Sequence, residues 1–332
     1  MSTRITLALG GRIDRRRFLR FVAAGVSSAA YVRTLMAQEP KAAKEPTSEK
    51  KEPTRFQIAC MTLVYSQFPF ERALNGIRAA GYRYLAWGTY HRDADGKRTP
   101  VMPEDAPPTR AAELGRRCRD LGLEPLMMFS GIYPDAPNHL AVFKNRIAQA
   151  AAAGIPQVLT FGHTKRGDYS RWIEHFKILG RVARDNHVQI VIKPHGGLTA
   201  TGKLAAKIVR EVADEGVKVN YDSGNLMDDP KIDAAAVIAD VQACAAEVRS
   251  FCIKDHRHFP KDEDCGPGFG EIDHYKLLHP VAFTGRPMPL CCENIFEPIV
   301  PRPSNPEGVD ALARRAREFL DVVIRGLQSG QS

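Results

Sequence analysis

The stretch VQIVIKPHGG, residues 188–197, begins as a hydrophobic β-strand and ends in polar residues and two glycines. Residues 190–192 form a short apolar run, which is typical of a strand buried on both faces. Lys193 and His195 follow at alternate positions, so an extended chain projects both side chains to the same side. A buried strand that ends by pointing a lysine and a histidine at one place indicates a functional site at that end.

The same alternation of strand and helix continues on both sides of this stretch. Amphipathic patterns such as RWIEHFKILGRVARDN separate the apolar runs, and several end in a glycine that suits a helix C-terminus. Eight such units in about 275 residues predict a (β/α)₈ TIM barrel, an α/β fold in a single domain over residues 55–328. A doubly wound open sheet is the alternative, but no glycine-rich dinucleotide motif follows the first strand. The eight strand candidates begin near Phe56, Tyr82, Glu124, Pro156, Val188, Val217, Ser250 and Pro289.

The charge of the chain is concentrated at its N-terminus. The 332 residues are 44% apolar and 26% charged, a composition that buries a sizeable core, and the formal net charge is +9. Residues 1–37 hold seven arginines and one aspartate, so +6 of that charge lies there and +3 in the rest. The predicted barrel therefore lacks the basic surface that nucleic-acid binding requires, and no nucleic-acid partner is expected.

The N-terminal segment has the features of an export signal. The run DRRRFLR, residues 14–20, precedes a moderately apolar stretch and resembles a twin-arginine motif. We expect residues 1–37 to be a twin-arginine signal that engages the export machinery and touches the membrane only transiently. The mature protein is then expected to be periplasmic or otherwise exported. Residues 38–54 are charged and proline-rich, which predicts a disordered linker. Of the seven cysteines, Cys60, Cys118 and Cys244 are interpreted as small core residues.

Four neighbouring strands end in polar or ionisable residues where apolar ones would be expected. At each end, two such residues lie two positions apart and so share a face of their strand. Catalytic residues of TIM barrels lie at the C-terminal ends of the strands, and clustered ionisable groups there suit acid–base or metal chemistry. The pairs are Lys193 with His195, Asn220 with Asp222, Cys252 with Lys254, and Cys291 with Glu293.

These strand ends carry a resemblance to a known family. The blocks PHGG, NYDSGN, IKDH, GPGFGEIDH and CCEN, within residues 56–325, resemble those of the xylose isomerase-like TIM barrels. That superfamily holds sugar and sugar phosphate isomerases and epimerases and a DNA-repair endonuclease. The resemblance implies a carbohydrate isomerase or epimerase with its site at the C-terminal mouth of the barrel.

The resemblance also implies a metal site, and this chain departs from it. In epimerases of the superfamily, Glu, Asp, His and Glu from four successive strands hold one divalent ion, and the two glutamates move the proton. Asp222 and Glu293 match the aspartate and the second glutamate. Lys193 stands at the position of the first glutamate and Cys252 at that of the histidine, so two of the four ligand types are replaced.

Three interpretations of this departure remain open. The ammonium of Lys193 could replace the metal by pairing with the two carboxylates. A divalent Mn, Zn or Co ion could be kept by Asp222, Glu293 and Cys252 with His195 or His256, the thiol favouring Zn. A lysine of lowered pKa could act as a base or form a Schiff base.

Further residues are candidates for substrate binding at the same mouth. Trp87 follows the second strand and could stack on a sugar ring, and His163 ends the fourth strand. Lys254 and Arg257 lie at and after the end of the seventh strand, where Arg257 could hold a hydroxyl or an anionic group. The glycines of residues 266–270 are expected to shape a loop over the site, because no Lys-Ser or Lys-Thr follows them as in a phosphate-binding loop.

The preferred hypothesis is a sugar isomerase or epimerase acting through an enediolate. Glu293 would transfer the proton, Lys193 or a divalent ion would stabilise the developing charge, and His195 would orient the substrate. The alternative is a barrel that binds carbohydrate without catalysis, which the two replaced ligand types favour. A metal-dependent DNA-repair phosphodiesterase is disfavoured, since its multi-metal ligands and basic face are missing from the sequence.

Overall fold

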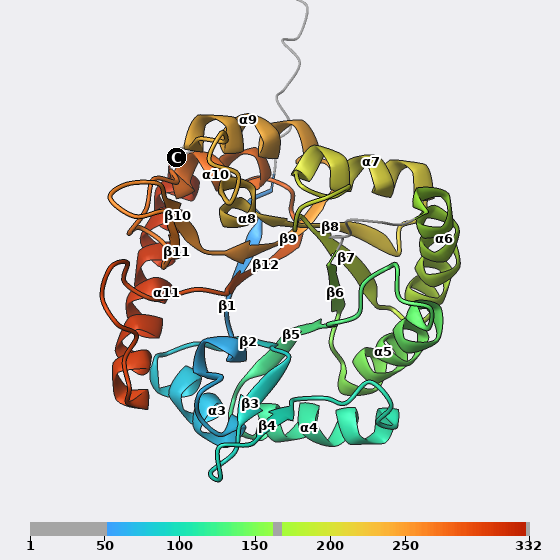
Figure 1. Cartoon of the computed structure of the whole chain (residues 1–332), viewed down its shortest axis with the longest axis horizontal. Helices are drawn as coiled ribbons and strands as arrows, with labels where there is room; N and C mark the ends of the chain where they lie inside the picture. Colours follow the sequence, from blue (N-terminus) through green and yellow to red (C-terminus); the bar gives the residue numbers. More distant parts are fainter. Residues whose placement is uncertain (1–51, 162–167, 330–332) are drawn as a thin grey trace, which may run out of the picture. The chain divides into compact units, whose positions relative to one another are not determined.

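Eight parallel strands close into a barrel in the computed structural model, which describes residues 52–161 and 168–329 (Figure 1). The order around the barrel is β1-β12-β9-β8-β7-β6-β5-β2, so each strand lies beside the one that the repeated strand–helix pattern predicts. The predicted (β/α)₈ fold is confirmed. The strands are β1 (Arg55–Met61), β2 (Tyr84–Trp87), β5 (Glu124–Phe129), β6 (Gln157–Phe161), β7 (Gln189–Lys193), β8 (Val217–Asp222), β9 (Val248–Ile253) and β12 (Pro287–Cys292).

Helices surround the barrel as an outer ring (Figure 1). They bury one apolar face against the strands and leave the other to solvent, as amphipathic sequences require. Capping is local: the Asp168 side chain accepts hydrogen bonds from the Ser170 and Arg171 amides at the start of α6. The helices of the ring are α3 (Phe70–Ala79), α4 (Pro108–Asp120), α5 (His139–Ala153), α6 (Tyr169–Asp185), α7 (Gly202–Val212), α9 (Ala234–Cys244) and α11 (Pro306–Ser329).

Short elements extend the loops that follow several strands. Two antiparallel hairpins, β3–β4 and β10–β11, follow β2 and β9 respectively. Such loops are where TIM barrels place their functional residues. The remaining short elements are β3 (Tyr90–Arg92), β4 (Arg98–Pro100), α8 (Ser223–Met227), β10 (Asp255–Arg257), β11 (Glu263–Cys265), α10 (His274–Leu278) and the 3₁₀ turns η1 (Thr62–Tyr65) and η2 (His279–Val281).

The core has two layers, one between strands and helices and one inside the barrel. The inner layer includes Val191, Cys252 and Cys291, each two positions before a residue at a strand end. Because side chains alternate across a strand, the residues two positions further on point to the barrel interior at its C-terminal mouth. This places Lys193 and Glu293 there. Cys60, Cys118 and Cys244 belong to the outer layer and are fully buried, as predicted.

The first described residues are tied to the barrel. Thr54, the last residue of the predicted linker, is buried and its hydroxyl donates a hydrogen bond to the carbonyl of Val281. The side chain of Gln328, near the end of α11, donates to the carbonyl of Thr54. The predicted signal, residues 1–37, lies outside the described residues. Among the helices of the described ranges, none combines the length and apolarity that a membrane crossing needs.

Candidate active site

The side chain of Lys193 lies between two carboxylates at the C-terminal mouth of the barrel. Its Nζ is 2.7 Å from Oδ2 of Asp222 and 2.5 Å from Oε2 of Glu293. Lys193 and Asp222 are completely buried, whereas the Glu293 side chain keeps a 16% exposed fraction. Glu293 is therefore the member of this trio that a molecule entering the mouth can reach.

Strand register brings these residues together. Asp222 pairs with Cys252 across β8 and β9, and Cys252 pairs with Cys291 across β9 and β12. Glu293 directly follows β12, and its amide donates to the carbonyl of Ile253. The predicted convergence of Lys193, Asp222, Cys252 and Glu293 on one place is therefore found in the structure: the last three offer ligand atoms within 4.8 Å of one another.

The charges of the trio stabilise one another. Burial lowers the pKa of Lys193, but the adjacent carboxylates of Asp222 and Glu293 outweigh burial and hold it well above its usual value. Burial likewise opposes the charge of Asp222, yet Lys193 and Lys254 bring its pKa down to about 2. Lys193 is thus a charged ammonium, and the interpretation as a lysine of lowered pKa, acting as a base or Schiff-base former, is wrong for this arrangement.

A second ammonium lies beside the first. Nζ of Lys254 is 2.7 Å from Oδ2 of Asp264 and 3.8 Å from Oδ1 of Asp222, and it donates to the side-chain oxygen of Asn225. The Asn225 side-chain nitrogen in turn donates to the carbonyl of Pro194 over 2.7 Å, which ties the end of β7 to α8. Lys254, a predicted substrate-binding residue, is therefore fixed by three neighbours at the same mouth.

The motif DSGN, residues 222–225, explains this packing locally. Asp222 caps α8, since its Oδ1 accepts from the Asn225 amide over 3.0 Å. A Cβ at Gly224 would lie 2.6 Å from Cε of Lys254, so only glycine leaves room for the lysine stem. The sequence motif points to this place, but Asn225 itself carries no separate signal. Asp264 carries no signal in the sequence. It lies on β11, in the segment that follows β9, where no regular apolar pattern marks the position of a side chain.

His256 does not join Asp222, Cys252 and Glu293, contrary to the sequence-based ligand set. It belongs to β10, which turns away from the barrel axis to pair with β11, opposite Asp264. Its two ring nitrogens contact carboxylates, Nδ1 at 3.0 Å from Asp264 and Nε2 at 2.8 Å from Asp262. It is thereby part of two other groups of candidate metal ligands, one with Asp228 and Asp264 and one with His258 and Asp262.

The trio around Lys193 does not fit a divalent ion as it stands. Metal–oxygen bonds of about 2.0–2.2 Å to the carboxylates would put the ion in contact with the ammonium, which repels it. Burial also raises the pKa of the Cys252 thiol well above its usual value, whereas thiolate is the form that binds metal. Lys193 therefore takes the cation position between Asp222 and Glu293.

The other predicted substrate-binding residues have different surroundings. Trp87, predicted to stack on a sugar ring, is completely buried in the layer between strands and helices, and it lines a cavity of about 810 Å³ together with Phe129. His195 is half-buried just after β7, and its amide donates to the carbonyl of Thr199. Nε of Arg257 donates to the carbonyl of Phe259, two residues on. His163 lies outside the described residues.

Asp255 fastens the loop that carries the glycine run. Its Oδ2 accepts from the Gly268 amide over 2.9 Å, and its Oδ1 accepts from the Ile272 amide over 3.0 Å. Asp255 is fully buried and uses both oxygens in this way. It therefore positions the loop rather than facing a substrate.

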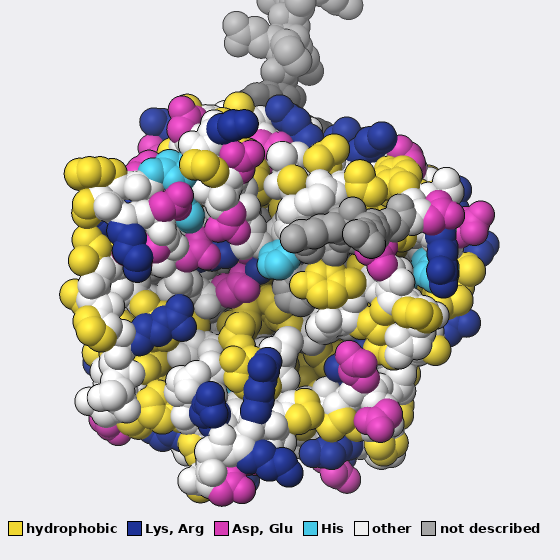
Figure 2. Space-filling view, viewed as in Figure 1, with side chains coloured by type: hydrophobic (Ala, Val, Ile, Leu, Met, Phe, Trp, Pro, Cys, Tyr) yellow, Lys and Arg dark blue, Asp and Glu magenta, His cyan; other side chains and the backbone are white. Residues whose placement is uncertain are grey.

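A pocket of about 310 Å³ opens onto the charged residues. Lys254, Asp264, Glu293, Asn294 and Arg302 supply its polar wall. Figure 2 shows a hollow at the centre of one face of the molecule, where acidic and histidine side chains meet apolar ones. One ammonium, one guanidinium, two carboxylates and an amide line this cavity, and together they are suited to bind hydroxyl and carbonyl oxygens and to move a proton.

The barrel agrees with a comparison to known families. The chain belongs to the xylose isomerase-like TIM barrel family, whose model matches residues 74–320. No curated protein matches the chain significantly.

Solved structures with the same fold include sugar epimerases. An L-ribulose 3-epimerase shares 15% identity with a TM-score of 0.62, covering 82% of this chain and 96% of its own. The D-psicose 3-epimerase of Clostridium cellulolyticum H10, solved with D-tagatose, shares 13% identity with a TM-score of 0.62, covering 81% and 99%. A barrel protein of Mycobacterium smegmatis in complex with magnesium shares 18% identity with a TM-score of 0.62, covering 82% and 97%. Similarity at this level of identity establishes the fold.

Proposed function

We propose that this protein is a carbohydrate isomerase or epimerase that moves a proton next to a carbonyl through an enediolate. The observation that carries the proposal is the accessible carboxylate of Glu293, held 2.5 Å from the buried ammonium of Lys193. Family membership and the epimerases among the similar structures support the substrate class.

In the proposed reaction, Glu293 removes the proton from the carbon beside the substrate carbonyl. The electron pair of that C–H bond forms the carbon–carbon double bond of the enediolate, and the carbonyl oxygen becomes negatively charged. The Lys254 ammonium, which lines the same pocket as Glu293, stabilises that oxygen together with Lys193. Return of that proton to the former carbonyl carbon, with transfer of the hydroxyl proton from the adjacent oxygen to the former carbonyl oxygen, completes an isomerisation. An epimerisation needs a second acid on the opposite face.

Lys193 supplies, in this proposal, the positive charge for which the sequence also allowed Mn, Zn or Co. A permanent ammonium stabilises negative charge on the substrate and needs no bound ion. His195 is proposed to orient the substrate from the end of β7. Asp222, fully buried, keeps Lys193 charged and in place.

The test is exchange of carbon-bound protons in deuterium oxide, followed by NMR over a panel of aldoses and ketoses. We expect one of these sugars to incorporate deuterium beside its carbonyl. Glu293→Gln should lower the exchange rate by about 10²–10⁴-fold with the fold intact, because the amide accepts no proton. Glu297→Gln, an exposed position on the same loop, should exchange like the wild type.

A second candidate function is carbohydrate binding without catalysis. It is favoured by the ion pair itself, since the contact with the Lys193 ammonium at 2.5 Å already occupies one oxygen of the Glu293 carboxylate. Sugar binding measured by calorimetry, with no deuterium incorporation into the bound sugar, would select this candidate and overturn the catalytic one.

A further inference from the structure

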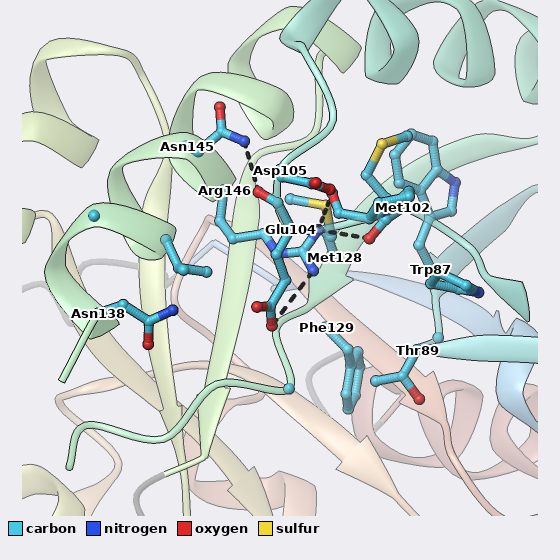
Figure 3. A pocket seen from close by; sticks show the side chains of 16 residues that line it. Trp87, Thr89, Met102, Glu104, Asp105, Met128, Phe129, Asn138, Asn145 and Arg146 are labelled. Atoms are coloured by element: carbon cyan, nitrogen blue, oxygen red, sulfur yellow. Dashed lines mark hydrogen bonds and ion pairs between the residues drawn. The ribbon is translucent and has the colours of Figure 1, made fainter. Parts of the chain in front are cut away.

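A second and larger cavity, drawn in Figure 3, shares the lining residue Thr89 with the charged pocket. Its volume is about 810 Å³, and most of its wall is apolar. It is bounded by the end of β2, the segment after β4, the end of β5 and the exposed side of α5. Its apolar wall includes Pro100, Met102, Pro103, Met128, Phe129 and Val142.

The two cavities adjoin one another. Thr89 lines both of them. Phe129 lines the larger cavity, and its ring centroid is 5.8 Å from Nζ of Lys193. A molecule whose reacting carbon lies at Glu293 can therefore extend past Thr89 and Phe129 into the larger cavity.

The wall of the larger cavity is held in place by hydrogen bonds from α5. Nη1 of the buried Arg146 donates to the carbonyl of Met102 over 2.8 Å and to Oε1 of Gln149 over 3.0 Å. The Asn145 side-chain nitrogen donates to the carbonyl of Glu104 over 2.7 Å (Figure 3). Segment 102–106 is thus anchored, and the cavity is preformed rather than a gap beneath a loose loop.

The two cavities differ in the chemistry that they suit. Ligand pockets measure roughly 300–1,000 Å³, so the charged pocket of about 310 Å³ accommodates a small polar molecule alone. The larger cavity also carries polar side chains, but a bare sugar gains little from the part of its wall formed by Met102, Met128 and Phe129, where its hydroxyls find no hydrogen-bond partners. An apolar or aromatic group gains by leaving water there.

We infer that the substrate is a carbohydrate that carries an apolar, preferably aromatic, substituent away from its carbonyl. The sugar part lies at Glu293 and Lys254, and the substituent lies against Met102, Met128 and Phe129. This inference rests on the proposed function for the sugar part and adds the substituent from the shape and lining of the second cavity.

The experiment compares the 6-O-benzyl and 6-O-methyl ethers of the four D-ketohexoses by titration calorimetry. We expect at least one benzyl ether to bind about tenfold or more tightly than its methyl counterpart, because burying a phenyl ring removes apolar surface from water. Ala141→Trp, on the exposed side of α5 within the cavity, should abolish that advantage and leave the affinity for the methyl ether unchanged.

Lys144→Trp is the matched control, since Lys144 is exposed on the same helix and does not line the cavity. It should keep the benzyl advantage. Equal affinity for every benzyl and methyl pair, absence of binding by any benzyl ether, or an undiminished advantage in Ala141→Trp would overturn the inference. Tighter binding of a benzyl ether without deuterium exchange would support the substituent site and reject the proton transfer. Deuterium exchange without tighter binding of any benzyl ether would support the proton transfer and reject the substituent site.

Discussion

Lys193 is buried at the end of a hydrophobic strand. An ammonium is stable in such a position only when nearby negative charges offset the loss of its hydration. Its partners Asp222 and Glu293 supply two negative charges at 2.7 and 2.5 Å. Lys254 adds a second positive charge next to Asp222, and Asp264 balances it. At the scale of residues, the site is a set of ions in which each group depends on the others.

Removal of the Lys193 charge should destabilise the fold. In Lys193→Met the buried carboxylates lose their nearest counter-ion, so the free energy of unfolding should fall by about 3–5 kcal/mol. Urea unfolding followed by circular dichroism measures the change. Lys207→Met, whose side chain is 62% exposed and pairs with Glu211 at 3.8 Å, should change it by less than about 0.5 kcal/mol. Equal effects of the two substitutions would contradict a compensated buried ion.

Reversal of the charge should create a metal site. Lys193→Glu places a third carboxylate beside Asp222, Glu293 and Cys252, a set that suits Mn, Zn or Co. After incubation with each ion and dialysis, elemental analysis should find about one ion per Lys193→Glu chain and a substoichiometric amount in the wild type. A stoichiometric transition metal in the wild-type protein would contradict this prediction, because it would mean that an ion binds although Lys193 is present.

At the scale of elements, side chains from neighbouring helices interact in ways that pH can alter. His139, at the start of α5, stacks on His175 of α6 with ring centroids 5.6 Å apart. Burial and the neighbouring His175 lower the pKa of His139 to about 4. The contact between α5 and α6 therefore requires a neutral imidazole at position 139.

This contact should weaken in mild acid. The unfolded chain binds a proton at position 139 below about pH 6.5 and the folded chain only near pH 4, so the stabilisation is complete above 6.5 and is lost as the pH falls. Between pH 7 and pH 4, proton uptake by the unfolded chain at this residue should lower the free energy of unfolding by about 3 kcal/mol. Urea unfolding at several pH values should show a smaller loss in His139→Phe than in the wild type. His279→Phe, at an exposed position, should keep the wild-type loss; the same loss in all three proteins would rule out His139 as the cause.

At the scale of the whole molecule, closure of the barrel decides which strand ends meet. Lys193 and Glu293 are 100 residues apart in the sequence and are joined because β7, β8, β9 and β12 are successive neighbours in the barrel. The same closure places β2 and β5 opposite them, with the larger cavity along their ends. The charged and the apolar cavities are thus products of one ring of strands.

The N-terminal segment gives a prediction for the molecule as a whole. With Arg15, Arg16 and Arg17 replaced by lysine, the chain should stay inside the cell, because lysine keeps the charge but lacks the planar guanidinium of a twin-arginine motif. Cell fractionation and immunoblotting of the wild type and the triple variant measure this. Arg33→Lys should be exported like the wild type, and unchanged export of the triple variant would argue against a twin-arginine route.

The sequence by itself determined the alternation of strands and helices and the convergence of Lys193, Asp222, Cys252 and Glu293. Both follow from local periodicity: apolar runs mark the strands, and residues two apart share a face. Parity along a strand is a property of a few consecutive residues, so it can be read without tertiary information.

Only the tertiary structure decided what lies beyond the strand ends. His256 follows β9 closely but turns away in the β10–β11 hairpin, and Asp264 reaches Lys254 from that same hairpin. Trp87 is buried in the outer layer and lines the larger cavity, which forms between segments far apart in the chain. Loop paths depend on hydrogen bonds and packing with distant residues, whereas strand periodicity is set by the backbone alone.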